Sequence, residues 1–500
     1  MGKENENTQI NPAVRDWLAR ASAGKLDTPS IVSGGDDAID VIDPGSEFVL
    51  ATLSPSHAAG ISLSIAQAQS ALDDGRWSER DADDRERVLL RLADLIARDH
   101  HLLSTLEALD TGKPLADAEI DIAEAEAVLR YYAGWCNKVV GYTIAAPRNL
   151  AASTHRGPVG VCVAITPWNY PLPILMYKLA PALAFGNSFI AKPSELAPLS
   201  AFRLSELCTE AGIPEGVFSL VFGGGDIGAQ LIAQPGIDKI AFTGSTATGR
   251  AIMKAAADHP TRVSLELGGK SPQVVFASAD IDKAVRGVAH GIWTNAGQVC
   301  VAGSRLVIAE SIKECFIESL MDYTDTFVIG HALDPHSTMG PIISRAQLAK
   351  LEKSVDQAIK SGGRIHNAGK LEVDSGFFMK PTVIDGLASD SDIHQEEVFG
   401  PVLAVETFSS EDEAIAKANA TRYGLAAGVW TGAAGQGQRV ARQLRSGSVW
   451  LNTYGIFHPT LPFGGAKASG FGRELGASAV EAYSELTTVV EDIAREDETA

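Results

Sequence analysis

The stretch GPVGVCVAIT, residues 157–166, is an almost unbroken apolar run of strand length. The segment YPLPILMYKLAPALAFG at 170–186 then has a helical pattern, and SFIAKPSE at 188–195 is strand-like again. A strand that is apolar at nearly every position is buried on both faces, as in parallel sheets with helices on either side. The alternation therefore predicts a doubly wound parallel α/β unit.

The same alternation continues to Gly269 and restarts with PQVVFAS at 272–278. Because 500 residues exceed what one hydrophobic core accommodates, we expect two large domains. The predicted fold class is α/β, with two doubly wound parallel-sheet domains. The first, Rossmann-like, comprises residues 1–137 and 158–268, and the second comprises residues 269–481.

Two segments, 138–157 and 482–500, fit neither domain. KVVGYTIAAPRNLAASTHRG in the first and ELTTVVEDI in the second have strand propensity without a clear partner in the sequence. We predict that they form a small oligomerisation arm, because exposed sheet edges favour pairing between subunits. An ordinary surface hairpin is the alternative.

The charge balance is acidic, with 62 Asp and Glu against 42 Lys and Arg and a formal charge of −20. Such a surface repels nucleic acid and anionic membranes, so we expect neither as a partner. The start MGKENENTQI lacks the features of a signal peptide, and no apolar run approaches the roughly 18 residues of a membrane span.

The five cysteines are odd in number and never in C-x-x-C spacing, which argues against a disulfide framework or a zinc site. The histidines also lack the spacing of metal ligands. We therefore expect no metal and a reducing, cytoplasmic setting.

Two glycine-containing turns are candidates for binding phosphate. The literal G-x-G-x-x-G at Gly223, Gly225 and Gly228 is a weak signal, because it does not follow the first strand of the unit. In FTGSTATG, a strand ends at Gly244 and Ser245 where a helix begins, so that free backbone N–H groups face an anion. A plain N-capped turn is the alternative.

Lys192 and Glu195 lie three residues apart after a strand, at the edge where ligands of open α/β sheets bind. Glu195 there is suited to accept hydrogen bonds from ribose hydroxyls while Lys192 donates; an exposed ion pair is the alternative.

Cys300 lies in GQVCVAGSR at 297–305, and taken alone it is either a nucleophile or a small buried apolar residue. Its companions favour the first interpretation. PWNYP (167–171), AKPSE (191–195), FTGST (242–246), LELGGKSP (265–272), EEVFGPV (396–402) and PFGGAKASGFGRELG (462–476) accompany it in this order. The set resembles the NAD(P)-dependent aldehyde dehydrogenase superfamily, from about residue 40 to 490.

The resemblance implies an NAD(P)-binding domain at 1–137 and 158–268, a catalytic domain at 269–481, and a homodimer or homotetramer joined through the arm. It implies that Cys300 is the nucleophile, Glu266 the general base and Asn169 the amide of the oxyanion hole. Lys178 and Glu474 match polar positions behind the base.

The resemblance also assigns the cofactor site. Lys192 and Glu195 match ribose-binding positions, Ser245 a pyrophosphate contact, and Glu397 and Phe399 the groups that hold the nicotinamide ribose and ring. The remaining matched positions are Ile165, Trp168, Gly228, Gly244 and Leu267. The expected cofactor is NAD, because Glu195 would repel a 2′-phosphate; NADP stays an alternative.

The implied chemistry explains these residue types. An aldehyde donates hydride poorly until a nucleophile makes its carbon tetrahedral, and a thiolate attacks well and leaves as a thioester. The oxyanion needs fixed donors, here Asn169 and the Cys300 backbone N–H. Glu266 then activates water, and its apolar turn is expected to raise its pKa.

Three other hypotheses for the function stay open at this point. Transfer of the acyl group to coenzyme A is disfavoured by the presence of Glu266, and a non-catalytic protein that retains the fold is disfavoured by the intact Cys300, Glu266 and Asn169. A cysteine hydrolase would need a histidine partner, and no motif near Cys300 contains one.

By position, six residues are expected to line the aldehyde tunnel: Ile174, Tyr177, Thr294, Val299, Val301 and Phe457. Tyr177 replaces a tryptophan of many relatives. The set is largely apolar and has no arginine to hold a carboxylate, so we expect an uncharged aliphatic or aromatic aldehyde as substrate. An amino-aldehyde or betaine-aldehyde, held by aromatic faces, is the alternative.

Overall fold

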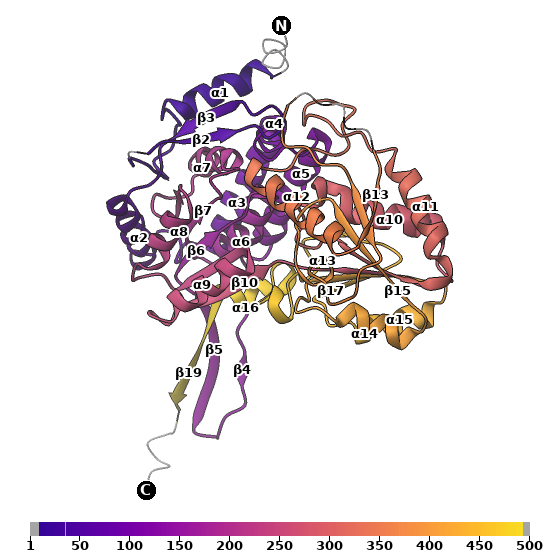
Figure 1. The fold of residues 1–500 in the computed structure, drawn as a ribbon. Helices are drawn as coiled ribbons and strands as arrows, with labels where there is room; N and C mark the ends of the chain where they lie inside the picture. The colour runs from indigo at the N-terminus through magenta and orange to yellow at the C-terminus, as the bar shows by residue number, and fades with distance from the viewer. Residues whose placement is uncertain (1–9, 36, 370, 372, 374, 494–500) are drawn as a thin grey trace.

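A computed structural model describes residues 10–35, 37–369, 371, 373 and 375–493. Two seven-stranded sheets with their helices form two lobes, and a third, small sheet projects below them (Figure 1).

The sheet of the first lobe has the strand order β1-β8-β7-β6-β9-β10-β18. Its strands are β1 (Ile31–Val32), β6 (Val161–Ile165), β7 (Ser188–Lys192), β8 (Phe218–Val221), β9 (Lys239–Gly244), β10 (Arg262–Leu267) and β18 (Gly470–Phe471). Alternate residues of β6 pack into different cores, Val161 and Val163 on one face and Cys162 and Ala164 on the other. The strand is therefore buried on both faces, as its apolar run predicts.

Helices cover both faces of this sheet. Those that share a core with Val161 are α2 (Ala58–Asp73), α8 (Gly225–Ile232) and α9 (Thr246–Ala256). Those on the opposite face are α3 (Ala82–Arg98), α4 (His100–Thr111), α5 (Leu115–Ala133), α6 (Pro171–Ala184) and α7 (Leu199–Ala211). Helix α1 (Pro12–Ser22) and the hairpin β2 (Ile39–Ile42) and β3 (Val49–Leu53) lie over the same lobe (Figure 1).

The second sheet has the order β13-β14-β15-β12-β11-β16-β17. Its strands are β11 (Pro272–Val275), β12 (Arg305–Ala309), β13 (Arg364–Asn367), β14 (Thr382–Asp385), β15 (Val402–Phe408), β16 (Ala426–Trp430) and β17 (Ser448–Leu451). The helices of this lobe are α10 (Ile281–Trp293), α11 (Lys313–Thr324), α12 (Arg345–Lys360), α13 (Asp392–Gln395), α14 (Glu411–Asn419) and α15 (Ala434–Gln443). Short helical turns are η1 (Thr294–Gly297), η2 (Glu310–Ile312), η3 (Lys467–Ser469) and η4 (Gly476–Ser478), and α16 (Ala479–Tyr483) follows them.

The predicted fold class is confirmed: both sheets are doubly wound and consist mainly of parallel strands. Two strands at sheet edges run antiparallel, β13 against β14 and β18 against β10. Strand β18 comes from the segment predicted for the second domain but joins the sheet of the first. Two residues are too short for any periodic signal, so the sequence pattern could not indicate this return.

The two segments outside the predicted domains pair with each other. Strands β4 (Thr143–Ile144), β5 (Leu150–Pro158) and β19 (Ser484–Asp492) form an antiparallel sheet in which Ser484 lies opposite Pro158 and Asp492 opposite Leu150. This sheet projects away from both lobes (Figure 1). Residues 494–500 of the predicted arm lie outside the described residues, and its role in oligomerisation stays a prediction.

Across the described part of the chain, no helix combines the length and apolar character needed to cross a membrane. In the same residues, no three or more His, Cys, Asp and Glu side chains come together as a metal would require.

Candidate active site

One cavity of about 230 Å³ is lined by residues of both lobes. Glu266 reaches it from β10, and Cys300 reaches it from the turn after η1. The six residues predicted for the tunnel all line it: Ile174, Tyr177, Thr294, Val299, Val301 and Phe457. The structure therefore brings the predicted nucleophile, base and tunnel together around one space.

A strained turn presents Cys300. Asn295 and Ala296 have φ of 48° and 51°, in the left-handed region that non-glycine residues rarely adopt. The buried side chain of Gln298 holds this turn: its Nε2 donates to the carbonyls of Asn295 (3.1 Å) and Pro341 (3.2 Å), and its Oε1 accepts the Ile343 N–H (2.9 Å). Such strain persists only where the surroundings fix it, which is common at functional sites.

Burial raises the pKa of the Cys300 thiol to about 12, and the nearby carboxylates of Glu397 and Glu266 act in the same direction. At neutral pH the side chain is therefore a thiol, and its attack on a carbonyl requires a base to take its proton.

Glu266 is buried, with only 4 % of its surface exposed. Its Oε2 accepts the Gly465 N–H at 3.2 Å, and its Oε1 has no hydrogen-bond partner. Burial and the neighbouring Glu474 carboxylate raise its pKa well above the ordinary value, as expected for its apolar turn. A free carboxylate oxygen with a raised pKa suits a general base.

Lys178 and Glu474 lie behind Glu266 as a buried ion pair. The Lys178 ammonium also donates to Thr243 Oγ1 at 2.8 Å. Both charged groups influence the Glu266 carboxylate, Lys178 by lowering its pKa and Glu474 by raising it. The pair is therefore placed to tune the pKa of the base, and Glu474, unlike Lys178, also lines the cavity.

Asn169 is buried beside the start of α6 and does not line the cavity. Its Nδ2 donates to the Gln298 carbonyl at 2.9 Å, and Asn295 Nδ2 donates to the Asn169 carbonyl at 3.2 Å. One N–H of the Asn169 amide is left over. Its predicted role in the oxyanion hole thus depends on that N–H or on a turn of the amide toward the cavity.

The predicted ribose-binding pair comes together at the end of β7. Lys192 Nζ lies 3.6 Å from the Glu195 carboxylate, and Lys192 is buried while Glu195 is partly exposed. A Cβ atom added at Gly228 would lie within 3.9 Å of Lys192 and Ile165, so these residues and the start of α8 share one surface.

Helix α9 begins at the predicted phosphate turn. Ser245 caps it, with Oγ accepting the Thr248 N–H at 3.1 Å after Gly244 ends β9. The neighbouring Thr246 hydroxyl is buried without a partner. A capped helix N-terminus with an unsatisfied hydroxyl fits the phosphates of a dinucleotide.

The predicted nicotinamide contacts also come together. Glu397 Oε1 accepts the Gly269 N–H at 3.0 Å, and the rings of Trp168 and Phe399 meet edge to face at 5.4 Å. Phe399 has a positive φ of 59°, and the Gln347 amide donates to its carbonyl at 3.2 Å. Leu267 lies against α9, where a Cβ at Gly249 would meet it at 2.6 Å.

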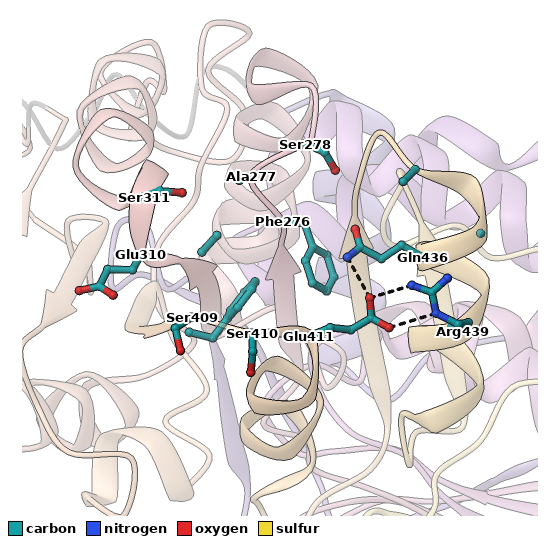
Figure 2. A pocket seen from close by; sticks show the side chains of 14 residues that line it. Phe276, Ala277, Ser278, Glu310, Ser311, Ser409, Ser410, Glu411, Gln436 and Arg439 are labelled. Carbon is teal, nitrogen blue, oxygen red and sulfur yellow. Dashed lines mark hydrogen bonds and ion pairs between the residues drawn. The ribbon is translucent and has the colours of Figure 1, made fainter.

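A larger cavity, of about 980 Å³, lies at the carboxyl ends of β11, β12 and β15. Figure 2 shows its side chains: Glu411 faces Gln436 and Arg439, and accepts hydrogen bonds from them at 3.0 and 2.9 Å. No predicted site residue lines this cavity, and its charged groups Glu411 and Arg439 pair with each other. The chemistry is therefore assigned to the smaller cavity.

The structure adds an acidic wall that the sequence analysis missed. Asp117, Asp121 and Glu124 of α5 line the small cavity together with Lys113. Their spacing of four and three residues places the three carboxylates on one face of a helix, and this signal was present in LADAEIDIAEAE. Lys113 forms an ion pair with Asp121, and the Tyr177 hydroxyl donates to Glu124.

Comparison with known proteins settles the family. The aldehyde dehydrogenase family matches residues 31–489. The chain belongs to the aldehyde dehydrogenase family. This enzyme is 42 % identical over 455 residues to the betaine aldehyde dehydrogenase of Bacillus subtilis (strain 168), covering 90 % of this chain and 93 % of the relative. It is 40 % identical over 453 residues to an aldehyde dehydrogenase of Alternaria alternata, covering 90 % and 91 %.

A solved structure has the same fold. The betaine aldehyde dehydrogenase of Staphylococcus aureus, in complex with NAD⁺, superposes on this enzyme with a TM-score of 0.93 at 36 % identity. The superposition covers 97 % of this chain and 98 % of that one.

Proposed function

We propose that this aldehyde dehydrogenase oxidises an aldehyde to a carboxylic acid with NAD, through a thiohemiacetal and then a thioester on Cys300 that water hydrolyses. The observation that carries the proposal is the arrangement of Cys300 and Glu266 on one small cavity. The overall reaction converts aldehyde, NAD⁺ and water to carboxylate, NADH and two protons.

The residues of the first lobe fit NAD. The Lys192–Glu195 pair is suited to the adenosine ribose, the start of α9 to the pyrophosphate, and Glu397 with Phe399 to the nicotinamide end. Glu195 would repel a 2′-phosphate, which favours NAD over NADP. The S. aureus relative in complex with NAD⁺ supports the same choice. We accordingly assign the first lobe as the cofactor domain and the second as the catalytic domain.

Our mechanism begins with proton transfer from the Cys300 thiol to Glu266, whose Oε1 is free. The sulfur then bonds to the carbonyl carbon, and the Cys300 backbone N–H and the Asn169 amide donate to the oxyanion. NAD⁺, when bound, supplies the hydride acceptor.

Glu266 first releases to solvent the proton that it took from Cys300. It then takes a proton from water, whose oxygen bonds to the thioester carbon, and the C–S bond breaks so that the Cys300 thiolate leaves and takes that proton from Glu266. The carboxylic acid product loses the second proton to solvent. During these proton transfers, the buried Lys178–Glu474 pair sets the pKa of Glu266, because Lys178 lowers it and Glu474 raises it. The presence of Glu266 favours hydrolysis over transfer of the acyl group to coenzyme A.

The acidic wall favours an aldehyde that carries a cationic nitrogen. Asp117, Asp121 and Glu124 face the cavity with a single cation, Lys113, among them, so the wall has an excess of negative charge when ionised. This supports the amino-aldehyde or betaine-aldehyde alternative over the uncharged aldehyde, as do the names of the relatives from B. subtilis and S. aureus.

The exposed apolar side chains of the projecting sheet support a homodimer or homotetramer. Ile144, Leu486, Val489 and Val490 are exposed there, and β19 and β4 leave the outer edges of the sheet unpaired within the described chain. Edges of this kind pair with a second copy.

NADH absorbance with a panel of uncharged, cationic and carboxylate-bearing aldehydes tests the proposed reaction. Cys300→Ala is expected to abolish turnover, whereas Cys315→Ala, which removes an exposed thiol, keeps it. Turnover by Cys300→Ala, or silence of the wild type on every aldehyde, contradicts the proposal.

A further inference from the structure

The acidic wall offers hydrogen-bond acceptors as well as charge. Asp117 lines the cavity, yet its carboxylate has no hydrogen-bond or ion-pair partner among the described residues. Glu124 accepts one hydrogen bond, from the Tyr177 hydroxyl, at its Oε1. A carboxylate has room for about four hydrogen bonds, so both side chains retain most of their accepting capacity.

The third carboxylate is already occupied. Asp121 is buried in an ion pair with Lys113. The Lys113 ammonium in turn lies 4.1 Å from the centroid of the Tyr170 ring, which also lines the cavity. This ring is thus engaged by a cation of the protein itself.

The free carboxylate oxygens and the occupied Tyr170 ring distinguish between two kinds of cationic nitrogen in a substrate. A quaternary ammonium has no N–H and is held by aromatic faces, whereas a protonated primary amine donates up to three hydrogen bonds to oxygen. In this cavity one aromatic face is taken by Lys113, and two carboxylates are left with free acceptors.

We propose that the enzyme prefers aldehydes bearing a protonated primary amine over quaternary-ammonium aldehydes of the same length, and that Glu124 and Asp117 are the residues that set this preference. The inference rests on the proposed oxidation and names its substrate class.

Tyr177 positions Glu124. Both residues line the cavity, Tyr177 from α6 and Glu124 from α5, and the Tyr177 hydroxyl donates a hydrogen bond to the Glu124 carboxylate. Phenylalanine at position 177 would keep the ring but leave the carboxylate free to rotate. Burial raises the pKa of Asp117 to about 6, so this second acceptor is largely ionised above neutral pH.

The test compares kcat/KM for 3-aminopropanal, its N,N,N-trimethyl analogue and propanal, which share one chain length. The wild type is expected to favour 3-aminopropanal over the trimethyl analogue at least tenfold. Glu124→Gln and Asp117→Asn are each expected to reduce that ratio at least fivefold, and Tyr177→Phe about threefold. Glu119→Gln makes the same charge change on the exposed side of α5 and leaves the ratio unaltered.

The propanal measurement distinguishes a failure of this inference from a failure of the proposed function. If the wild type oxidises propanal but prefers the trimethyl analogue, the inference is wrong and the proposed function stands. If Glu124→Gln lowers kcat/KM for all three aldehydes equally, Glu124 has a structural role only and the inference is again overturned. If the wild type binds NAD but oxidises none of the three, the proposed function itself fails.

Discussion

Gly268→Ala is a sharp test of the nicotinamide end of the cofactor site. A Cβ at this position would lie 1.9 Å from Glu397 Oε2, whereas ordinary contacts begin at 3.4 Å. The carboxylate therefore has to retreat by more than an ångström, which breaks its 3.0 Å hydrogen bond from the Gly269 N–H. The displaced atoms are the end of a flexible side chain, so the fold is expected to survive.

The expected loss follows from the hydrogen bond that the displaced Glu397 carboxylate would otherwise accept from the nicotinamide ribose in the proposed site. A hydrogen bond to a charged group contributes about 1.5–3 kcal/mol, which corresponds to a roughly 10- to 100-fold fall in kcat/KM for NAD. The assay belongs at pH 8, because burial raises the pKa of Glu397 to about 7 and the carboxylate is ionised above that value.

Gly435→Ala is the matched control, since a Cβ there would meet only the Arg439 guanidinium, at 3.8 Å. Both variants are expected to keep the thermal midpoint of the wild type within a few degrees. A Gly268→Ala enzyme whose kcat/KM for NAD stays within twofold of the wild type refutes the placement of Glu397.

Three further predictions address the thiol, the cofactor and the arm. Alkylation of Cys300 by iodoacetamide, followed on its peptide by mass spectrometry, should rise about tenfold per pH unit from pH 7 to 10, because its pKa is about 12; a plateau below pH 9 contradicts this. Glu195→Gln should increase the ratio of NADP to NAD turnover several-fold, since the carboxylate that repels a 2′-phosphate is gone; an unchanged ratio argues against a ribose contact. Val490→Lys, on the exposed face of β19, should shift the mass measured by light scattering toward the monomer, and an unaltered mass removes the arm from the interface.

The sequence predicted the two sheets well because their central strands are short apolar runs between helices of crossover length. β6 is the clearest example, since it is buried on both faces as its composition requires. The sequence could not predict the pairing of β19 with β5, because this pairing joins residues more than 300 positions apart. Strand propensity indicates that such segments form a sheet, but it does not indicate which strands they pair with.

For the site, Cys300, Glu266 and the predicted tunnel residues lie around one cavity, and their roles stay predictions. The substrate was harder to predict because the tunnel residues expected by position include none of the acidic wall. Helix α5 carries no motif, so the sequence analysis assigned no role to its carboxylates, although their spacing places them on one side of the helix. Only the packing of α5 against α6 shows that this side faces the cavity.

The most direct test of the central claim is the intact mass of Glu266→Gln after incubation with NAD and propanal. We expect a slow burst of NADH that ends at the enzyme concentration, because without Glu266 the thiol attacks only through its small thiolate fraction. We also expect an acyl group attached through a thioester to the Cys300 peptide, because the base that activates water is missing. Full turnover without any acyl-enzyme, or a burst whose acyl group lies on another residue, contradicts the account.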